Sequence, residues 1–268
     1  MRAWGKSDTR ADSTRSVPSP LGGTVYQQWR INSAGGNEHR RSNAPPVAGE
    51  EVHVGDLGSG SDFTPFLQRA GVPSTDIGSE GPYGVYHSAF DNFAWYTQNA
   101  DPKFVYLQEM ARVLGLEALR MADADVLPYD YAAYASAIES YIQAAKRRAG
   151  DDGLGSLDFA PAQAAASRFA VAAQKARSRQ IAATGDLAKL NLALRETETA
   201  LLSPAGLPNR PWYRHTIFAP GEFTGYAAVV IPGVNEAIDA RDSNRAAQQL
   251  AVLAEALDRA AHTLDPAP

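Results

Sequence analysis

One histidine stands in a sequence context that could support chemistry. Of the five histidines, only His87 follows a run of glycine, proline and aromatic residues, GPYGVY, and precedes Ser88. We expect this run to leave a sheet edge, where α/β proteins place ligands, so that the imidazole faces a cleft. A lone histidine is more often a hydrogen-bonded structural residue, and no HExxH or comparable metal-binding spacing accompanies this one. The residues alone leave both interpretations open.

A glycine- and serine-rich loop, LGSGSD at residues 57–62, is the second candidate. Where such a loop opens a helix, its backbone N–H groups could face an anion or a substrate carbonyl. The pattern is neither a P-loop nor a dinucleotide fingerprint, and taken alone it favours a plain turn. Ser59 and Ser61 have no visible base partner and no GxSxG context, so a serine hydrolase is not expected.

The elements that must position these residues change along the chain. Residues 1–50 are rich in Ser, Gly, Pro, Asn and Arg, which indicates loop or disorder around one aromatic island at residues 26–29. Residues 52–84 are short apolar pieces punctuated by glycine. They predict a strand, a loop, a short helix ending at Gly71 and a second strand, which together make an α/β unit.

From Pro102 onward, apolar residues recur at three- and four-residue spacing, which predicts helices. The predicted helices cover residues 104–121, 131–150, 161–183, 187–201 and 243–264. Together they indicate a helical bundle. Their stripes hold few large residues, and each buried Leu, Ile or Phe contributes roughly 1.5 to 3 kcal/mol, so a partner surface would stabilise them. A segment at residues 201–238, dense in Pro, Gly and aromatics, is predicted to be a non-helical, functional insertion.

Composition excludes several classes of protein. The chain has 268 residues, enough for one large or two modest domains, and 44% of them are hydrophobic. No apolar run approaches the roughly 18 to 20 residues of a membrane span, and no apolar region follows the basic N-terminal residues as in a signal peptide. Cysteine is absent, which excludes disulfides and thiolate zinc sites. With a net charge of −5 and no basic stripe, a nucleic-acid partner is not expected.

Four strings resemble, in order and spacing, successive landmarks of the glutamate carboxypeptidase II family, which includes N-acetylated-alpha-linked acidic dipeptidases and transferrin receptors. The strings are LGSGSDFTPFLQRAGVPS, YGVYHSAFDNFAWYTQNADPKFVY, ADADVLPYDYAAYA and GLPNRPWYRHTIFAP. The resemblance implies an α/β remnant of a zinc-exopeptidase domain followed by a mainly α-helical, transferrin receptor-like dimerisation domain. Its implied boundaries are a loop-like or disordered N-terminus at 1–21, an incomplete peptidase domain at 22–124 and the dimerisation domain at 125–268.

The same resemblance implies roles for particular residues. His87 matches the family's final zinc ligand, and Tyr86 matches the catalytic residue that hydrogen-bonds the tetrahedral oxyanion. Ser59, Gly60 and Ser61 match the loop that lines the substrate cleft. Tyr226 keeps the tyrosine of a Lys-Tyr pair that binds substrate carboxylates in the acidic-dipeptidase members, but Gly225 stands at the lysine position. Because this lysine is missing, we expect the parent enzyme to accept a broader range of peptide substrates.

The family's other zinc ligands and its general base have no counterpart in the chain and would precede Met1. A two-metal site needs several ligands, so we expect this chain to be inactive alone and not to bind zinc stably. The first hypothesis is therefore the C-terminal portion of a zinc exopeptidase that forms a homodimer through its C-terminal helices. The alternatives are a non-catalytic homodimerisation module and an unrelated helical adaptor. Family members are often exported, but the compartment of this chain stays open.

Overall fold

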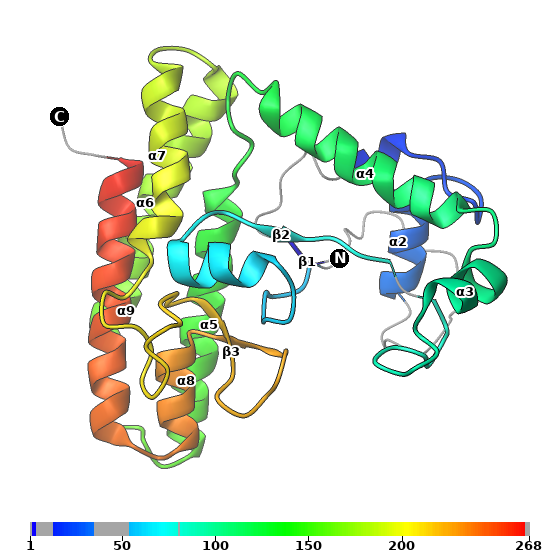
Figure 1. The fold of residues 1–268 in the computed structure, drawn as a ribbon. Coiled ribbons are helices and arrows are strands. Elements are labelled where there is room, and N and C mark those ends of the chain that lie inside the picture. Colours follow the sequence, from blue (N-terminus) through cyan, green and yellow to red (C-terminus); the bar gives the residue numbers. More distant parts are fainter. Residues whose placement is uncertain (1, 4–12, 35–53, 80, 266–268) are drawn as a thin grey trace. The chain divides into compact units, whose positions relative to one another are not determined.

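The computed structural model describes residues 2–3, 13–34, 54–79 and 81–265, which fall into two compact units. Among the described residues, the first unit comprises 13–34, 54, 77–79 and 81–124, and the second comprises 2–3, 55–76 and 125–265. The chain is mainly helical (Figure 1). No helix in the described ranges combines the length and the apolar character needed to cross a membrane.

The second unit is built around a helical bundle. Its helices are α5 (Tyr131–Asp151), α6 (Ala160–Ala182), α7 (Leu187–Ala200), α8 (Pro232–Asp239) and α9 (Ser243–Leu264). Helix α9 packs against α6, α7 and α8, and α5 packs against α6. Figure 1 shows α6, α7 and α9 side by side. The helical bundle expected from the sequence is confirmed.

Three of these helices begin with the same capping interaction. The side chain of Asp130 accepts a hydrogen bond from the N–H of Ala133 at the start of α5. Asp186 and Asp242 cap α7 and α9 in the same way. Each cap satisfies a backbone donor that has no partner inside the helix, and removing such a cap costs about 1 kcal/mol. The positions of these aspartates therefore fix where the helices begin.

Alanine dominates the face of α6 that packs into the bundle. The buried residues of this face are Ala162, Ala165, Ala166, Phe169, Ala172, Ala173 and Ala176. Phe169 is the one large side chain among them, and its ring lies edge-on to that of Tyr131 with centroids 6.2 Å apart. Because interaxial distance depends on the side chains at the contact, alanine lets the neighbouring helices approach closely.

Two short helices contradict expectations from the sequence. Helix α8 lies inside the insertion predicted to be non-helical, and α2 (Val25–Ala34) lies inside the stretch predicted to be mostly loop. Proline at the first position of α8 has the φ angle that a helix start requires. At α2, Thr24 accepts from the N–H of Gln27, and the Gln27 side chain accepts from the N–H of Thr24. This reciprocal capping box offsets the poor helix-forming composition around it.

The expected α/β unit is only partly visible. A short π-helical segment, η1 (Pro65–Ala70), ends at Gly71 in the left-handed conformation, as predicted. The following segment forms β2 (Thr75–Asp76), which pairs antiparallel with β1 (Arg2–Ala3). The strand expected from residue 52 begins outside the described residues. The only other ladder in the described ranges is antiparallel, so the structure shows no sheet layer of a peptidase domain there.

The first unit contains α3 (Phe93–Trp95), which continues into η2 (Tyr96–Ala100), and α4 (Val105–Ala122), the first of the helices predicted from the sequence. Asp101 is buried where these helices meet and accepts hydrogen bonds from the N–H groups of Val105, Tyr106 and Leu107 at 2.8–3.0 Å. Burial raises the pKa of this carboxyl. The bonds from these amides and from the Tyr96 hydroxyl outweigh burial, so that the pKa is lowered.

We predict that Asp101→Ala lowers the free energy of unfolding of the first unit by about 2 kcal/mol at neutral pH, because three amides at the start of α4 lose their acceptor. The folded-state pKa of Asp101 lies below its unfolded value. Its stabilising effect is therefore present above the unfolded pKa and is lost as the pH falls through the folded pKa. Denaturant unfolding at several pH values should show the two proteins converging in acid. Asp91→Ala, at an exposed position in the same unit, is the control, and an equal loss there would contradict the prediction.

Candidate functional site

Two loops far apart in the sequence meet in the second unit. The N–H of Ser59 donates to the carbonyl oxygen of Tyr226 at 3.0 Å. Gly60 has φ +94°, and a Cβ added to it would lie 2.7 Å from the Tyr226 ring. A Cβ on Gly58 would collide with the Tyr226 backbone. The loop at residues 57–62 therefore needs glycine at two positions to approach the loop at residues 221–226.

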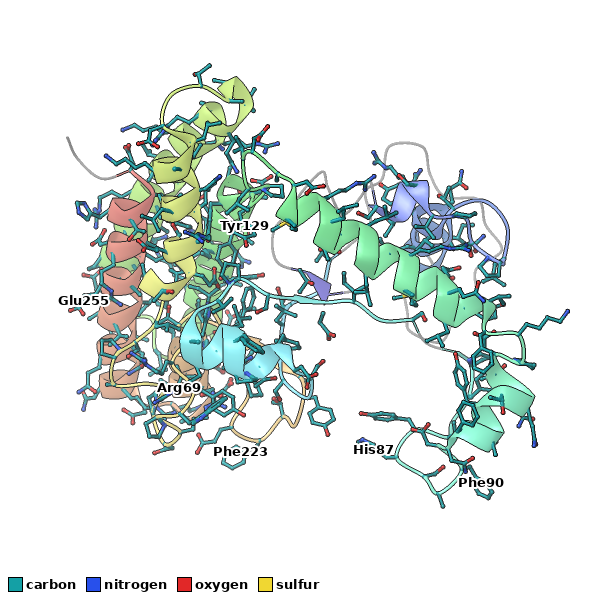
Figure 2. The ribbon with its side chains drawn as sticks, turned by 45° about the horizontal axis from the view of Figure 1, so that its top comes forward. Arg69, His87, Phe90, Tyr129, Phe223 and Glu255 are labelled. Atoms are coloured by element: carbon teal, nitrogen blue, oxygen red, sulfur yellow. The ribbon has the colours of Figure 1, made fainter. Side chains whose placement is uncertain are left out.

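The second of these loops presents aromatic side chains to solvent. It connects β3 (Phe218–Pro220) to β4 (Ala228–Val230), which pair antiparallel. Phe223 is 92% exposed and Tyr226 is 55% exposed. Figure 2 shows Phe223 projecting from this loop. An exposed aromatic pair beside a glycine loop is able to contact an extended peptide through stacking and apolar burial.

A largely buried ion pair supports the same loop from behind. Arg210 lies 2.6 Å from the carboxylate of Glu236 on α8, and the N–H of Glu222 donates to that carboxylate at 2.9 Å. Burial raises the pKa of Glu236. The Glu222 amide and the Arg210 charge act in the opposite direction but offset this increase only in part. The resulting contacts fix one side of the loop to α8.

A fully buried acid–imidazole pair lies under the hairpin formed by β3 and β4. Nε2 of His215 lies 2.6 Å from Oε1 of Glu198, and both side chains are 0% exposed. Nδ1 of His215 accepts from the N–H groups of Ile217 and Phe218 at 3.2 and 3.0 Å. Because Nδ1 is an acceptor, the proton of a neutral imidazole resides on Nε2 and is donated to Glu198.

Sequence reasoning missed His215 and Glu198. It singled out His87 among the histidines, because only His87 stood among glycine and aromatic residues. His215 precedes the apolar run TIFAP, and this position at the start of an apolar run was the available signal. Glu198 is one of two glutamates near the end of α7, and nothing in their spacing distinguishes the buried one from Glu196.

Tyr86 and His87 lie on an exposed segment of the first unit. His87 has φ +60°, and its ring stacks on that of Tyr86 with centroids 3.8 Å apart. Tyr86 is 67% exposed. A non-glycine residue in the left-handed region costs of order 1–3 kcal/mol, and such strain is concentrated at functional sites. Figure 2 shows His87 and Phe90 on this segment.

A metal site requires more than His87. Within the part of the chain that the structure describes, no three His, Cys, Asp or Glu side chains are grouped so as to hold a metal ion. A two-metal site needs several such ligands. The described residues by themselves therefore do not fit the zinc that the family resemblance implies.

The predicted site residues fall into two groups. The substrate-binding candidates Ser59, Gly60, Ser61 and Tyr226 belong to the second unit, and Ser59 and Gly60 contact Tyr226 there. Ser61 is exposed on the same loop, and its carbonyl accepts from the N–H of Thr64. The catalytic candidate Tyr86 and the metal candidate His87 belong to the first unit, where they stack on each other.

Comparison with known proteins places this geometry in context. Residues 157–265 match the transferrin receptor-like dimerisation domain. "Probable glutamate carboxypeptidase LAMP1" of Arabidopsis thaliana is 36% identical over 81% of this chain and 29% of its own length. "Probable glutamate carboxypeptidase" of Arthroderma benhamiae is 32% identical over 85% of this chain and 30% of its own. "Aminopeptidase NAALADL1" of Rattus norvegicus is 28% identical over 94% and 35%. The chain thus spans about a third of the length of these relatives.

We predict that Gly60→Ala separates the two loops. The added Cβ would meet the Tyr226 ring, and alanine disfavours φ +94°. Amide hydrogen exchange at Ser59, whose N–H donates to Tyr226, should accelerate roughly tenfold, equivalent to about 1.4 kcal/mol of local opening. The matched control is Gly150→Ala on α5, where a Cβ meets nothing within 4 Å. Unchanged exchange at Ser59 in the Gly60 variant would refute the contact.

Proposed function

Because this chain belongs to the glutamate carboxypeptidase and transferrin receptor family of zinc peptidases, we propose that it supplies the dimerisation domain and part of the substrate cleft of a zinc-dependent exopeptidase. The observation that carries this proposal is the packing of the Ser59–Gly60 loop against Tyr226. The family resemblance implies that Ser59, Gly60 and Ser61 line the substrate cleft and that Tyr226 binds substrate. Their direct contact supports a shared role.

We propose that two segments of the chain have different roles. Residues 125–268 act as the dimerisation domain, and residues 22–124 act as the end of a peptidase domain of α/β type. In a complete enzyme, His87 would be one of several zinc ligands and Tyr86 would hydrogen-bond the oxyanion. The remaining ligands and the general base have no counterpart among the family landmarks of this chain. These 268 residues are therefore expected to be inactive without polypeptide that carries them.

The proposed substrates are peptides whose bound side chain does not need a cationic partner. Residues 221–226 contain no Lys or Arg, and Gly225 carries no side chain at the position where acidic-dipeptidase members have lysine. Phe223 and Tyr226 offer exposed aromatic surface instead. A glutamate carboxylate bound there would lose water without gaining an ion pair, so neutral side chains are favoured.

A second candidate function is a non-catalytic homodimerisation module. The observation that favours it is that His87 stands in no metal-ligating cluster within the described ranges. The two candidates share the dimerisation domain and differ in whether zinc chemistry is retained. An unrelated helical adaptor is excluded, because the relatives extend over most of the chain.

We predict that the purified 268-residue chain contains well under one zinc per chain and cleaves neither carboxypeptidase nor aminopeptidase substrates. Metal analysis and peptide hydrolysis on one preparation test both points. Adding the separately produced metal-ligand region of a relative should restore zinc binding if the chain is part of a peptidase. Stoichiometric zinc and hydrolysis by the chain alone would overturn the expected incompleteness of the site.

The groove between α6 and α9 is our candidate for the dimer interface. It has a volume of about 500 Å³ and includes Val171, which is 58% exposed. Two ion pairs also line it, Arg168 with Asp258 and Lys175 with Asp265, each at 2.7 Å. A face that holds both charges around an apolar centre is able to pair with a second copy of itself across a two-fold axis. The groove lies within the matched dimerisation domain.

We predict that Val171→Glu weakens the homodimer at least about tenfold, because it places a third carboxylate beside Asp258 and Asp265 in the groove. Sedimentation equilibrium at micromolar concentration measures the change. Leu192→Glu on α7, at a 44% exposed position outside the groove, is the matched control and should leave the dimer intact. A monomeric wild-type chain, or equal effects of the two substitutions, would argue against this interface.

A further inference from the structure

We propose that Gln68, Glu198 and His215 are positioning residues that hold the two cleft loops, residues 57–62 and 221–226, in register with each other. This inference rests on the proposed role of those loops in substrate binding. The three side chains lie in the core beneath the loops and are 0% exposed. The hydrogen bonds that the Gln68 carbonyl accepts from Arg214 and His215 join segments that are more than a hundred residues apart in the sequence.

Gln68 connects both loops through one residue. Its side-chain Nε2 donates to the carbonyl oxygen of Gly58, within the first loop. Its backbone carbonyl accepts from the N–H groups of Arg214 and His215 at 2.8 and 3.2 Å, in the segment that leads into the hairpin. A displacement of Gln68 would therefore move the glycine loop and the base of the hairpin together.

His215 fixes the chain where it enters the hairpin. Its Nδ1 accepts from the N–H groups of Ile217 and Phe218, which sets the turn before β3. Ile217 in turn accepts from the N–H of Ile231 at 2.8 Å, and Phe218 pairs with Val230. The orientation of one imidazole is thereby transmitted along both strands to the loop that carries Tyr226.

Glu198 ties this arrangement to the helical bundle. It lies near the end of α7, and its Oε1 faces the Nε2 proton of His215. Nearby, the carbonyl of Leu201 accepts from both the N–H and the hydroxyl of Thr216 at 3.2 and 2.7 Å. Helix α7 packs on α9, so these contacts fix the position of the hairpin relative to the helical bundle.

The chemistry of the pair indicates positioning rather than general stabilisation. Well-packed apolar residues of similar volume often match or exceed the stability that a buried charged pair provides. What apolar residues cannot do is accept two backbone amides on one side and donate to a carboxylate on the other. An imidazole with a fixed tautomer performs both, and its planar ring makes the two directions rigid.

The test is site-resolved amide hydrogen exchange on the full 268-residue chain. The Ser59 amide reports the contact between the loops, since it donates to Tyr226, and amides in the middle of α6 report the bundle. Gln68→Leu and His215→Leu should each accelerate Ser59 exchange roughly tenfold or more while the α6 amides stay protected. Glu198→Gln keeps an acceptor for the Nε2 proton and should preserve the wild-type rate at Ser59.

Two outcomes would overturn the proposal. One is unchanged Ser59 exchange in a folded Gln68→Leu protein, which would mean that the loops hold each other without the buried residues. The other is equal acceleration at Ser59 and in α6, which would assign these residues to global stability. Gln68→Leu introduces no buried charge, so it keeps the test decisive if the His215 variant does not fold. The measurement needs neither zinc nor activity. A negative result would therefore overturn the positioning role without deciding the proposed function.

Discussion

The hydrogen bond between Glu198 and His215 is the contact on which the arrangement of the candidate cleft depends. Both side chains are fully buried, and their nitrogen and oxygen atoms lie 2.6 Å apart. Removing one partner would leave the other buried with its best partner gone, which costs far more than the net value of an average hydrogen bond. The turn before β3, the pairing of β3 with β4 and the position of Tyr226 all follow from the imidazole that this bond orients.

Close backbone approach is the second constraint, and it acts both in the bundle and in the candidate cleft. In α6, alanine allows the neighbouring helices to come near. In the loop at residues 57–62, Gly58 and Gly60 allow the chain to lie directly against Tyr226. The bundle gains its stability from many small contacts, whereas the loop gains a defined geometry. A larger residue at Gly58 or Gly60 would therefore push the loop away from Tyr226. A larger residue on an exposed face of the bundle would have little effect.

Sequence reasoning succeeded where the signal was local and periodic. The apolar stripes of α4, α5, α6, α7 and α9 predicted those helices, and Gly71 predicted the end of η1. The predictions were wrong at α8, where proline and glycine favoured a loop but a two-turn helix forms. They were also wrong at α2, where a capping box stabilises a helix in a stretch whose composition predicts a loop. Among the candidate site residues, Gly60 and Tyr226 were predicted by resemblance. Gln68, Glu198 and His215 were not, because burial of a polar side chain depends on segments distant in the sequence.

The sequence by itself determined the helical bundle and the family, and it predicted which loops could meet a substrate. These follow from periodicity, from turn-forming residues and from ordered landmarks, all of which act over short stretches of chain. Only the tertiary structure decided that the glycine loop touches Tyr226, and that a buried glutamate and histidine sit beneath the hairpin. The reason is physical: a hydrogen bond between buried groups exists only after the chain has brought them together and excluded the water that would otherwise satisfy each of them.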